Sequence, residues 1–447
     1  MAENGSKQRP VRTLTVKNFS VIKEAKLEFG KITVLIGPQA SGKSLLCKLA
    51  YFLGKELVEQ TITCVVQGVQ WDEFLQIASR AISVRFTLSQ QVVAARAYVE
   101  FSSNEYKAAF SWEGGSDSPT ARFSHAFEEK YRTILSSYHK APPSASGAFI
   151  PGGISAPARL EDVWIGVNQT LFGNDLRGLF YAPAGRAFFT DFTKGLVVAQ
   201  NVTVDPITRD FAGQLLWDSD WKKGLLTTGR GVTDEINRRM TDIASGFVMI
   251  DSGTPRFVTI DGRKLTLNVL STGIQELIPL FNILEQLMYF REHGVETAKV
   301  ARDPQRAKIV SKPFLFLEEP EANVFPKTQY ELVKLFAWLA NDPVLDFDWV
   351  ITTHSPYILS SFNNLIEAGQ AARNNPNLHD QVAKIIPEQY WIKEGDFKAY
   401  AIENGKLKSI LNESGFVEGN YLDQVSEVIG NEFDELLRLE YEHTKAS

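Results

Sequence analysis

The chain has 447 residues and a formal net charge of −6, from 47 basic and 53 acidic side chains. Its hydrophobic content of 44% and charged content of 22% are ordinary for a globular protein and exclude the wholly disordered, collagen-like and disulfide-scaffold classes. Two cysteines, a polar N-terminus and the lack of any run of about eighteen apolar residues predict a cytoplasmic protein with no membrane partner.

The first elements in chain order are three strands and a helix. Residues 13–16 and 25–29 alternate between apolar and polar side chains, and 32–36 form a continuous apolar run of the kind buried in a central sheet. A glycine-rich turn follows, and helical periodicity runs from about residue 42 to 58. The sequence therefore predicts a strand–turn–helix unit here.

This turn carries a phosphate-binding motif, G-x-x-x-x-G-K-[ST]. Its eight residues are Gly37, Pro38, Gln39, Ala40, Ser41, Gly42, Lys43 and Ser44. In such a loop the backbone N–H groups and the helix N-terminus bind phosphates, the lysine reaches the β- and γ-oxygens, and the serine hydroxyl ligates Mg²⁺. We therefore expect these residues to bind ATP and Mg²⁺, and a plain glycine-rich turn is the alternative.

The middle of the chain reads as strands and loops. Three alternating stretches, 82–88, 95–101 and 106–112, predict an antiparallel meander. Residues 141–157 are rich in Pro, Gly and Ser and predict a loop. Three more stretches between 247 and 269 predict a second meander.

A second candidate anion site lies at Leu-Ser-Thr-Gly, residues 270–273, just before an apolar helix expected over 277–290. The hydroxyl of Ser271, the backbone of Gly273 and the helix N-terminus would together bind a phosphate. The alternative is an ordinary helix N-cap, and the two readings are compatible because one N-cap can do both.

Two carboxylates follow a buried strand expected over 313–317. Because ligands bind at the carboxyl edge of open α/β sheets, Glu318 is placed to hold Mg²⁺ and Glu319 to polarise the attacking water. A solvated acidic turn is the alternative. A helix is expected next, over 327–340.

A histidine follows the next buried strand, expected over 349–353. His354 is the only one of the six histidines in this position, and it could reach a γ-phosphate or its water; a purely structural histidine is the alternative. Beyond it, 390–394 and 399–405 predict a short strand pair, and residues 432–447 predict a charged amphipathic helix.

Taken in order, these four motifs resemble the layout of ABC-type ATPases, and most closely the SMC/RecF/OLD branch. The matching segments are 16–44, which is similar to that branch's N-terminus, 318–326, similar to its EEPEAHLxP element, and 353–356, similar to its THSP switch. The segment 181–186 resembles its PAxR element and implies that Arg186 faces the nucleotide. Thr272 stands where transporters usually have glycine, and Glu318 where aspartate is common.

The resemblance implies an α/β fold: a P-loop NTPase with an ABC-type ATPase head, an antiparallel β-subdomain and a helical insertion. It also implies a composite site, in which Ser271 and Gly273 of one protomer close over the ATP bound by another. Catalysis would fall to Glu319 and His354. The expected divisions are an N-terminal core part, 11–80, a β-subdomain, 81–205, a helical insertion, 206–246, a C-terminal core part, 247–360, and an extension, 361–447.

The expected function is a slow Mg-ATP-dependent ATPase. A compact chain of this branch, without a coiled coil between the motifs or a Toprim domain after them, resembles the ATPase halves of two-gene anti-phage systems such as PARIS and Septu. The resemblance implies a homodimer or higher oligomer that senses a trigger and controls a separate, nuclease-like effector protein. The alternatives are a RecF/SMC-like repair ATPase acting on DNA, a transporter subunit and a non-hydrolysing ATP sensor.

Overall fold

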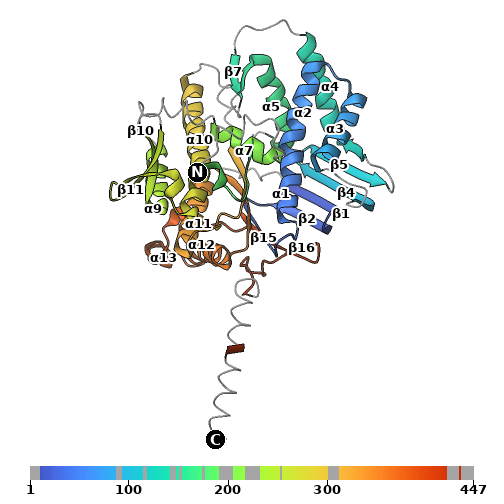
Figure 1. The fold of residues 1–447 in the computed structure, drawn as a ribbon. Coiled ribbons are helices and arrows are strands. Elements are labelled where there is room, and N and C mark those ends of the chain that lie inside the picture. Colours follow the sequence, from blue (N-terminus) through green and yellow to red (C-terminus); the bar gives the residue numbers. More distant parts are fainter. Residues whose placement is uncertain are drawn as a thin grey trace, which may run out of the picture.

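The computed structural model describes most of the chain (Figure 1). The described residues are 11–86, 93–113, 118–140, 147–150, 154–173, 177–190, 205–216, 232–251, 254–300, 312–419 and 432–433. The helix expected over 432–447 lies outside them, apart from its first two residues. Within the described ranges, no helix is both long and apolar enough to cross a lipid bilayer.

One mixed sheet organises the fold, with the strand order β6-β5-β4-β1-β2-β16-β15-β3-β14-β13-β9. Its strands in chain order are β1 (Arg12–Phe19), β2 (Ile22–Phe29), β3 (Ile32–Ile36), β4 (Val93–Ser103), β5 (Tyr106–Glu113), β6 (Thr120–Phe123), β9 (Arg177–Ala182), β13 (Lys312–Glu318), β14 (Asp348–Thr353), β15 (Phe397–Glu403) and β16 (Lys406–Ser409). The neighbours β15, β3, β14, β13 and β9 are all parallel. The β1, β2, β4, β5 and β6 end is antiparallel.

The parallel half of the sheet is covered on both faces. Along β13, Phe314 and Phe316 enter one hydrophobic core, while Leu315 and Leu317 enter the other. A strand with two buried faces is typically apolar along most of its length. This explains the apolar runs at the centres of β13 and its neighbour β14, and both expected strands are confirmed.

Helices form two groups, one on each side of the sheet (Figure 1). The first group packs over the phenylalanine face and consists of α1 (Lys43–Tyr51), α2 (Leu57–Gln67), α3 (Trp71–Phe86), α4 (His125–Lys140) and α5 (Ala158–Phe172), with a π-helical turn Phe52–Glu56 joining α1 to α2. The second group packs over the leucine face and consists of α7 (Pro206–Leu216), α9 (Val232–Ala244), α10 (Thr272–Val300), α11 (Pro326–Asn341), α12 (Pro356–Asn374) and α13 (His379–Ile385).

The second predicted meander is confirmed as a separate antiparallel sheet beside α9 and α10 (Figure 1). Its strands are β10 (Gly246–Asp251), β11 (Thr254–Thr259) and β12 (Lys264–Thr266). A 3-10 turn, Leu267–Val269, then leads into α10. The Leu-Ser-Thr-Gly segment therefore follows this small sheet directly in the chain.

The strand expected over 82–88 is wrong as far as the structure describes it, because residues 82–86 end helix α3. Phe74, Ala78 and Ile82 are buried at intervals of four, which is the stripe of a helix packed on one side. Val84, whose alternation suggested a strand, is 78% exposed. The other two stretches of that meander are confirmed as the antiparallel pair β4 and β5.

Two further expectations are corrected. The loop expected over 141–157 contains a small antiparallel pair, β7 (Gly147–Ile150) and β8 (Ile154–Pro157). The strand expected over 390–394 is absent: Tyr390 ends a 3-10 turn, and residues 391–394 belong to no strand. The hairpin partner of β15 is instead β16, joined through a tight turn at Asn404 and Gly405, both of which have positive φ.

Candidate active site

The register of three parallel strands brings the predicted motifs to one edge of the sheet. Ile36 of β3 pairs with Thr353 of β14, and Thr352 pairs with Glu318 of β13. Neighbouring strands lie about 4.8 Å apart, so the ends of β3 and β13 lie about 10 Å apart with the end of β14 between them. The P-loop, the two carboxylates and the histidine therefore leave the sheet side by side, at the edge where α/β proteins bind ligands.

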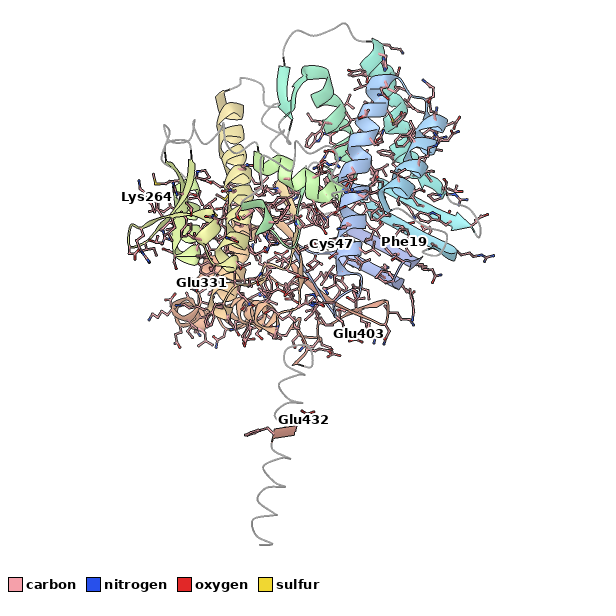
Figure 2. The ribbon with its side chains drawn as sticks, in the orientation of Figure 1. Phe19, Cys47, Lys264, Glu331, Glu403 and Glu432 are labelled. Carbon is pink, nitrogen blue, oxygen red and sulfur yellow. The ribbon has the colours of Figure 1, made fainter. Side chains whose placement is uncertain are left out.

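The P-loop backbone has the conformation that its glycines allow. Gly42 has φ 106° and Ala40 has φ 58°. The φ of Gly42 strains any residue with a side chain, and a Cβ there would also lie 2.5 Å from Ile22 Cδ1 of β2. Helix α1 then begins at Lys43 and runs into the core, where Cys47 is buried (Figure 2).

Lys43 lies across the mouth of this loop. Its Nζ donates to the carbonyl oxygens of Gly37 (2.7 Å) and Pro38 (2.9 Å), and its side chain is buried. Burial lowers the pKa of the Lys43 ammonium, while the carboxylates of Glu319 and Glu321 act in the opposite direction. The Lys43 ammonium therefore lies between the P-loop and the carboxylates of Glu319 and Glu321.

Glu318 is oriented by the segment that follows β9. Its Oε1 accepts a hydrogen bond from the Tyr181 hydroxyl (2.7 Å), and its Oε2 accepts one from the Ala184 backbone N–H (3.1 Å). Burial, followed by the charge of Glu318, raises the pKa of Tyr181 well above its usual range, so the phenol stays a donor. The carboxylate is thus fixed before any ligand arrives, while its place as a metal ligand stays a prediction.

Glu319 and His354 form a direct pair at the edge. Glu319 Oε1 lies 3.2 Å from His354 Nε2. Glu319 also has φ 41°, a left-handed conformation that strains a non-glycine residue by an amount on the order of 1–3 kcal/mol. Its backbone N–H donates to Thr352 O (2.9 Å), which anchors the strained turn to β14. Such strain clusters at functional sites.

A third carboxylate, missed as a site residue from the sequence, completes this group. Glu321 Oε1 accepts hydrogen bonds from the Thr353 hydroxyl (2.7 Å) and from the His354 backbone N–H (2.6 Å). Burial raises the pKa of Glu321, and these two hydrogen bonds oppose the rise. The sequence signal that could have identified Glu321 is its position, two residues after Glu319 in the same acidic segment.

The Leu-Ser-Thr-Gly segment starts α10 beside the carboxylate turn. Ser271 is exposed and precedes the first helical residue, while Gly273 is buried. A Cβ on Gly273 would lie 2.4 Å from the carbonyl oxygen of Asn323, within the turn that follows Glu319. The glycine is therefore needed for this close packing within one chain. Contact of either residue with a nucleotide stays a prediction.

Replacing Gly273 with alanine should destabilise the fold by about 1–3 kcal/mol, because the added methyl forces the Asn323 turn to move. Urea unfolding measures this. The matched control is Gly213→Ala on α7, where an added Cβ meets nothing within 4 Å. Equal free energies of unfolding for the two variants would contradict the packing argument.

Arg186 is enclosed by its own chain, and the expected contact with a nucleotide stays a prediction. Its side chain is 0% exposed. Its guanidinium donates to the carbonyl oxygens of Glu318 (2.5 Å), Pro183 (2.8 Å) and Glu319 (3.1 Å), and it pairs with Glu276 of α10 at 3.6 Å. Arg186 thus joins the carboxylate turn to α10 from beneath the site.

Replacing Arg186 with methionine should lower the free energy of unfolding by about 3–5 kcal/mol, since it leaves the buried Glu276 carboxylate without its cation. Chemical denaturation measures the loss. Arg238→Met, which breaks an exposed pair with Glu235, is the control and should cost less than about 1 kcal/mol. A similar small cost at position 186 would remove Arg186 from this structural role.

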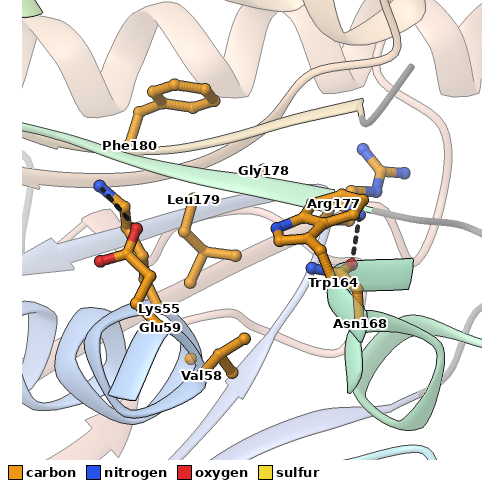
Figure 3. A pocket seen from close by; sticks show the side chains of 10 residues that line it. Lys55, Val58, Glu59, Trp164, Asn168, Arg177, Gly178, Leu179 and Phe180 are labelled. Carbon is orange, nitrogen blue, oxygen red and sulfur yellow. Dashed lines mark hydrogen bonds and ion pairs between the residues drawn. The ribbon is translucent and has the colours of Figure 1, made fainter. Parts of the chain in front are cut away.

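A separate hollow lies under the amino-terminal half of β9, away from the motif-bearing edge (Figure 3). It is a small hollow of about 40 Å³, and helices α2 and α5 form its walls. Its charged groups are already paired: Lys55 with Glu59 at 3.8 Å, and the Arg177 guanidinium with Asp346 at 3.3 Å. The Arg177 backbone N–H donates to Asn168. Because β9 runs parallel to β3, this hollow lies far from the end of the strand that carries the P-loop.

The residues at the edge fit a triphosphate and Mg²⁺. Ser41 Oγ is buried in the loop without a hydrogen-bond partner, which leaves one polar group for a ligand to satisfy. Ser44 is exposed in the first turn of α1. Magnesium in such sites needs only one or two protein oxygens because phosphates and waters complete its shell. Accordingly, the described residues contain no preformed cluster of three or more metal-binding side chains.

The strand–P-loop–helix unit, with acidic residues and a histidine on the neighbouring strand ends, defines a P-loop ATPase of α/β class. Residues 214–359 match the family model described as an AAA ATPase domain, a segment that contains the Leu-Ser-Thr-Gly, Glu-Glu-Pro and histidine motifs. Among curated proteins, no sequence matches the chain.

Similar folds occur among solved structures. The SMC head domain from Thermotoga maritima is 13% identical with a TM-score of 0.39, covering 91% of this chain and 100% of its own. An Smc head bound to the C-winged helix domain of ScpA is 11% identical with a TM-score of 0.41, over 90% and 96%. An Smc head with an extended coiled coil, bound to a ScpA domain derived from Pyrococcus furiosus, is 10% identical with a TM-score of 0.36, also over 90% and 96%.

Proposed function

We propose that the chain hydrolyses ATP with Mg²⁺ at the edge formed by β3, β14 and β13. The observation that carries this is the Glu319–His354 pair, 3.2 Å apart, within the electrostatic reach of the P-loop lysine. A carboxylate beside an imidazole is suited to orienting water and accepting its proton. Phosphate release with Mg²⁺ and with EDTA tests the proposal, and Mg²⁺-independent release or none at all contradicts it.

The chain's own residues divide this work. Lys43 and the loop amides bind the phosphates, and Ser44 with Glu318 would hold Mg²⁺, which neutralises charge on the phosphate oxygens when bound. Glu319 orients the water and takes its proton. His354, paired with Glu319, lies where it can sense the γ-phosphate.

A second copy of the chain completes the site in this proposal. Ser271 is exposed at the start of α10, where a helix N-terminus favours anions. Phe325 and Tyr357, which follow the carboxylate turn and the histidine, are 75% and 55% exposed at the same edge. A partner copy that covered these two side chains would remove their apolar area from water. ATP-dependent dimerisation in light scattering tests this, and a monomer at saturating ATP contradicts it.

The biological role we propose is that of an oligomeric scaffold that senses a trigger and controls a separate nuclease-like effector in anti-phage defence. Its support is the resemblance of the motifs to that family. Co-purification from the native host, with and without ATP, tests it. The rival role, a RecF/SMC-like ATPase acting on DNA, predicts turnover that rises with added DNA and falls with salt.

A further inference from the structure

We propose that Glu321 is a positioning residue that holds His354 against Glu319. The inference rests on the proposed hydrolysis and deepens it, because it names a residue to which no role in the site has been given. Glu321 lies in the turn after β13, and its side chain extends to the end of β14. There it contacts the backbone of His354, whose ring pairs with Glu319.

Two carboxylates approach His354 from different sides. Glu319 contacts the ring at Nε2, whereas Glu321 accepts from the backbone N–H of the same residue at 2.6 Å. Glu321 also accepts from the hydroxyl of Thr353, the last residue of β14, at 2.7 Å. One oxygen atom of Glu321 thus binds both the last residue of β14 and the backbone of His354.

The contact extends into α11. The Thr353 hydroxyl oxygen accepts from the Ser355 backbone N–H (2.9 Å), and the Ser355 hydroxyl donates to Gln329 Oε1 (2.5 Å). Gln329 and Ser355 are both buried. The position of His354 is therefore determined by a continuous hydrogen-bonded path from Gln329 to Glu321, and removing Glu321 frees the end that lies next to the catalytic pair.

Glu321 has a second, unused oxygen. Its Oε2 is buried and makes no hydrogen bond, so the two donors are satisfied by Oε1 alone. A glutamine can present the same acceptor oxygen, whereas an alanine leaves a buried hydroxyl and a backbone N–H without an acceptor. The comparison of these two variants separates hydrogen-bond acceptance from mere occupation of space.

The test compares Glu321→Ala and Glu321→Gln with Glu331→Ala, a control on α11 (labelled in Figure 2) whose carboxylate contacts only the nearby Lys334 among the described contacts. We expect Glu321→Ala to lower kcat by about 10- to 100-fold, as small misplacements of catalytic groups do. Its Kd for ATP should stay within about threefold of wild type. Glu321→Gln should recover most of the turnover. Wild-type turnover in Glu321→Ala, an equal loss in both variants, or a matching loss of ATP affinity would overturn the proposal.

A second readout does not depend on hydrolysis. The ring signals of the six histidines can be followed by NMR, and the His354 signal identified by its loss in His354→Gln. We expect Glu321→Ala to move the His354 signal, and Glu321→Gln and Glu331→Ala to leave it in place. If the wild type hydrolyses nothing, the proposed function fails while this measurement still decides the role of Glu321. An unmoved signal in Glu321→Ala overturns that role.

Discussion

Replacing Lys43 with alanine should weaken ATP binding at least about 100-fold, or about 2.7 kcal/mol. The ammonium lies across the P-loop mouth, 2.7 Å from Gly37 O and 2.9 Å from Pro38 O. A bound triphosphate would offer it charge-assisted hydrogen bonds in place of these neutral ones. Isothermal calorimetry with ATP measures the loss, and circular dichroism shows whether the variant is folded.

Lys48→Ala is the matched control for this substitution. Lys48 lies on the same helix but pairs with Asp205 at 2.9 Å, away from the loop. Its removal should change the Kd for ATP by less than about threefold. If Lys43→Ala binds ATP as tightly as the control does, the P-loop does not bind nucleotide and the whole site assignment fails.

The parts of the fold that the sequence predicted share one property: their pattern is local. The strands β3, β13 and β14 are buried on both faces, so each has a mainly apolar centre that can be recognised without knowing its neighbours. The P-loop is likewise determined within eight residues, by glycines and a helix start. The AAA ATPase match over 214–359 supports the class that these elements indicated.

The sequence pattern gave the wrong element where one segment fits both the period of a strand and the period of a helix. Residues 82–86 alternate as a strand would, yet Ile82 also continues the stripe of Phe74 and Ala78, four residues apart. Helix packing against α4 and β6 selects the second period, and nothing within 82–88 contains that information. The exposure of Val84 shows that one apolar position in the alternation was coincidental.

Other features depend on residues far apart in the chain. Arg186 binds Glu276 and the carbonyl of Glu318, 90 and 132 residues away, so its buried role cannot be inferred from the segment around it. Strand β15 is inserted between β16 and β3, next to the P-loop strand, although it lies near the C-terminal end of the described core. In both cases the partner is chosen by tertiary packing.

Replacing Glu319 with glutamine should lower ATP turnover by at least about 100-fold while leaving the Kd for ATP within about threefold. Glutamine has the shape of glutamate and can still contact His354 Nε2, 3.2 Å from the present Oε1. It cannot accept a proton from water. Phosphate release measures the rate, and Glu331→Gln on α11 is the control because it makes the same change away from the site.

The same variant separates catalysis from assembly. If ATP closes two copies over a shared site, slow hydrolysis must lengthen the life of the closed state, and Glu319→Gln should accumulate as an ATP-bound dimer in size-exclusion chromatography. Normal turnover would remove Glu319 from the role of base. Slow turnover without a dimer would leave Glu319 in the role of base. It would contradict closure of the site by Ser271 of a partner copy, because the bound ATP would then be held by one chain alone.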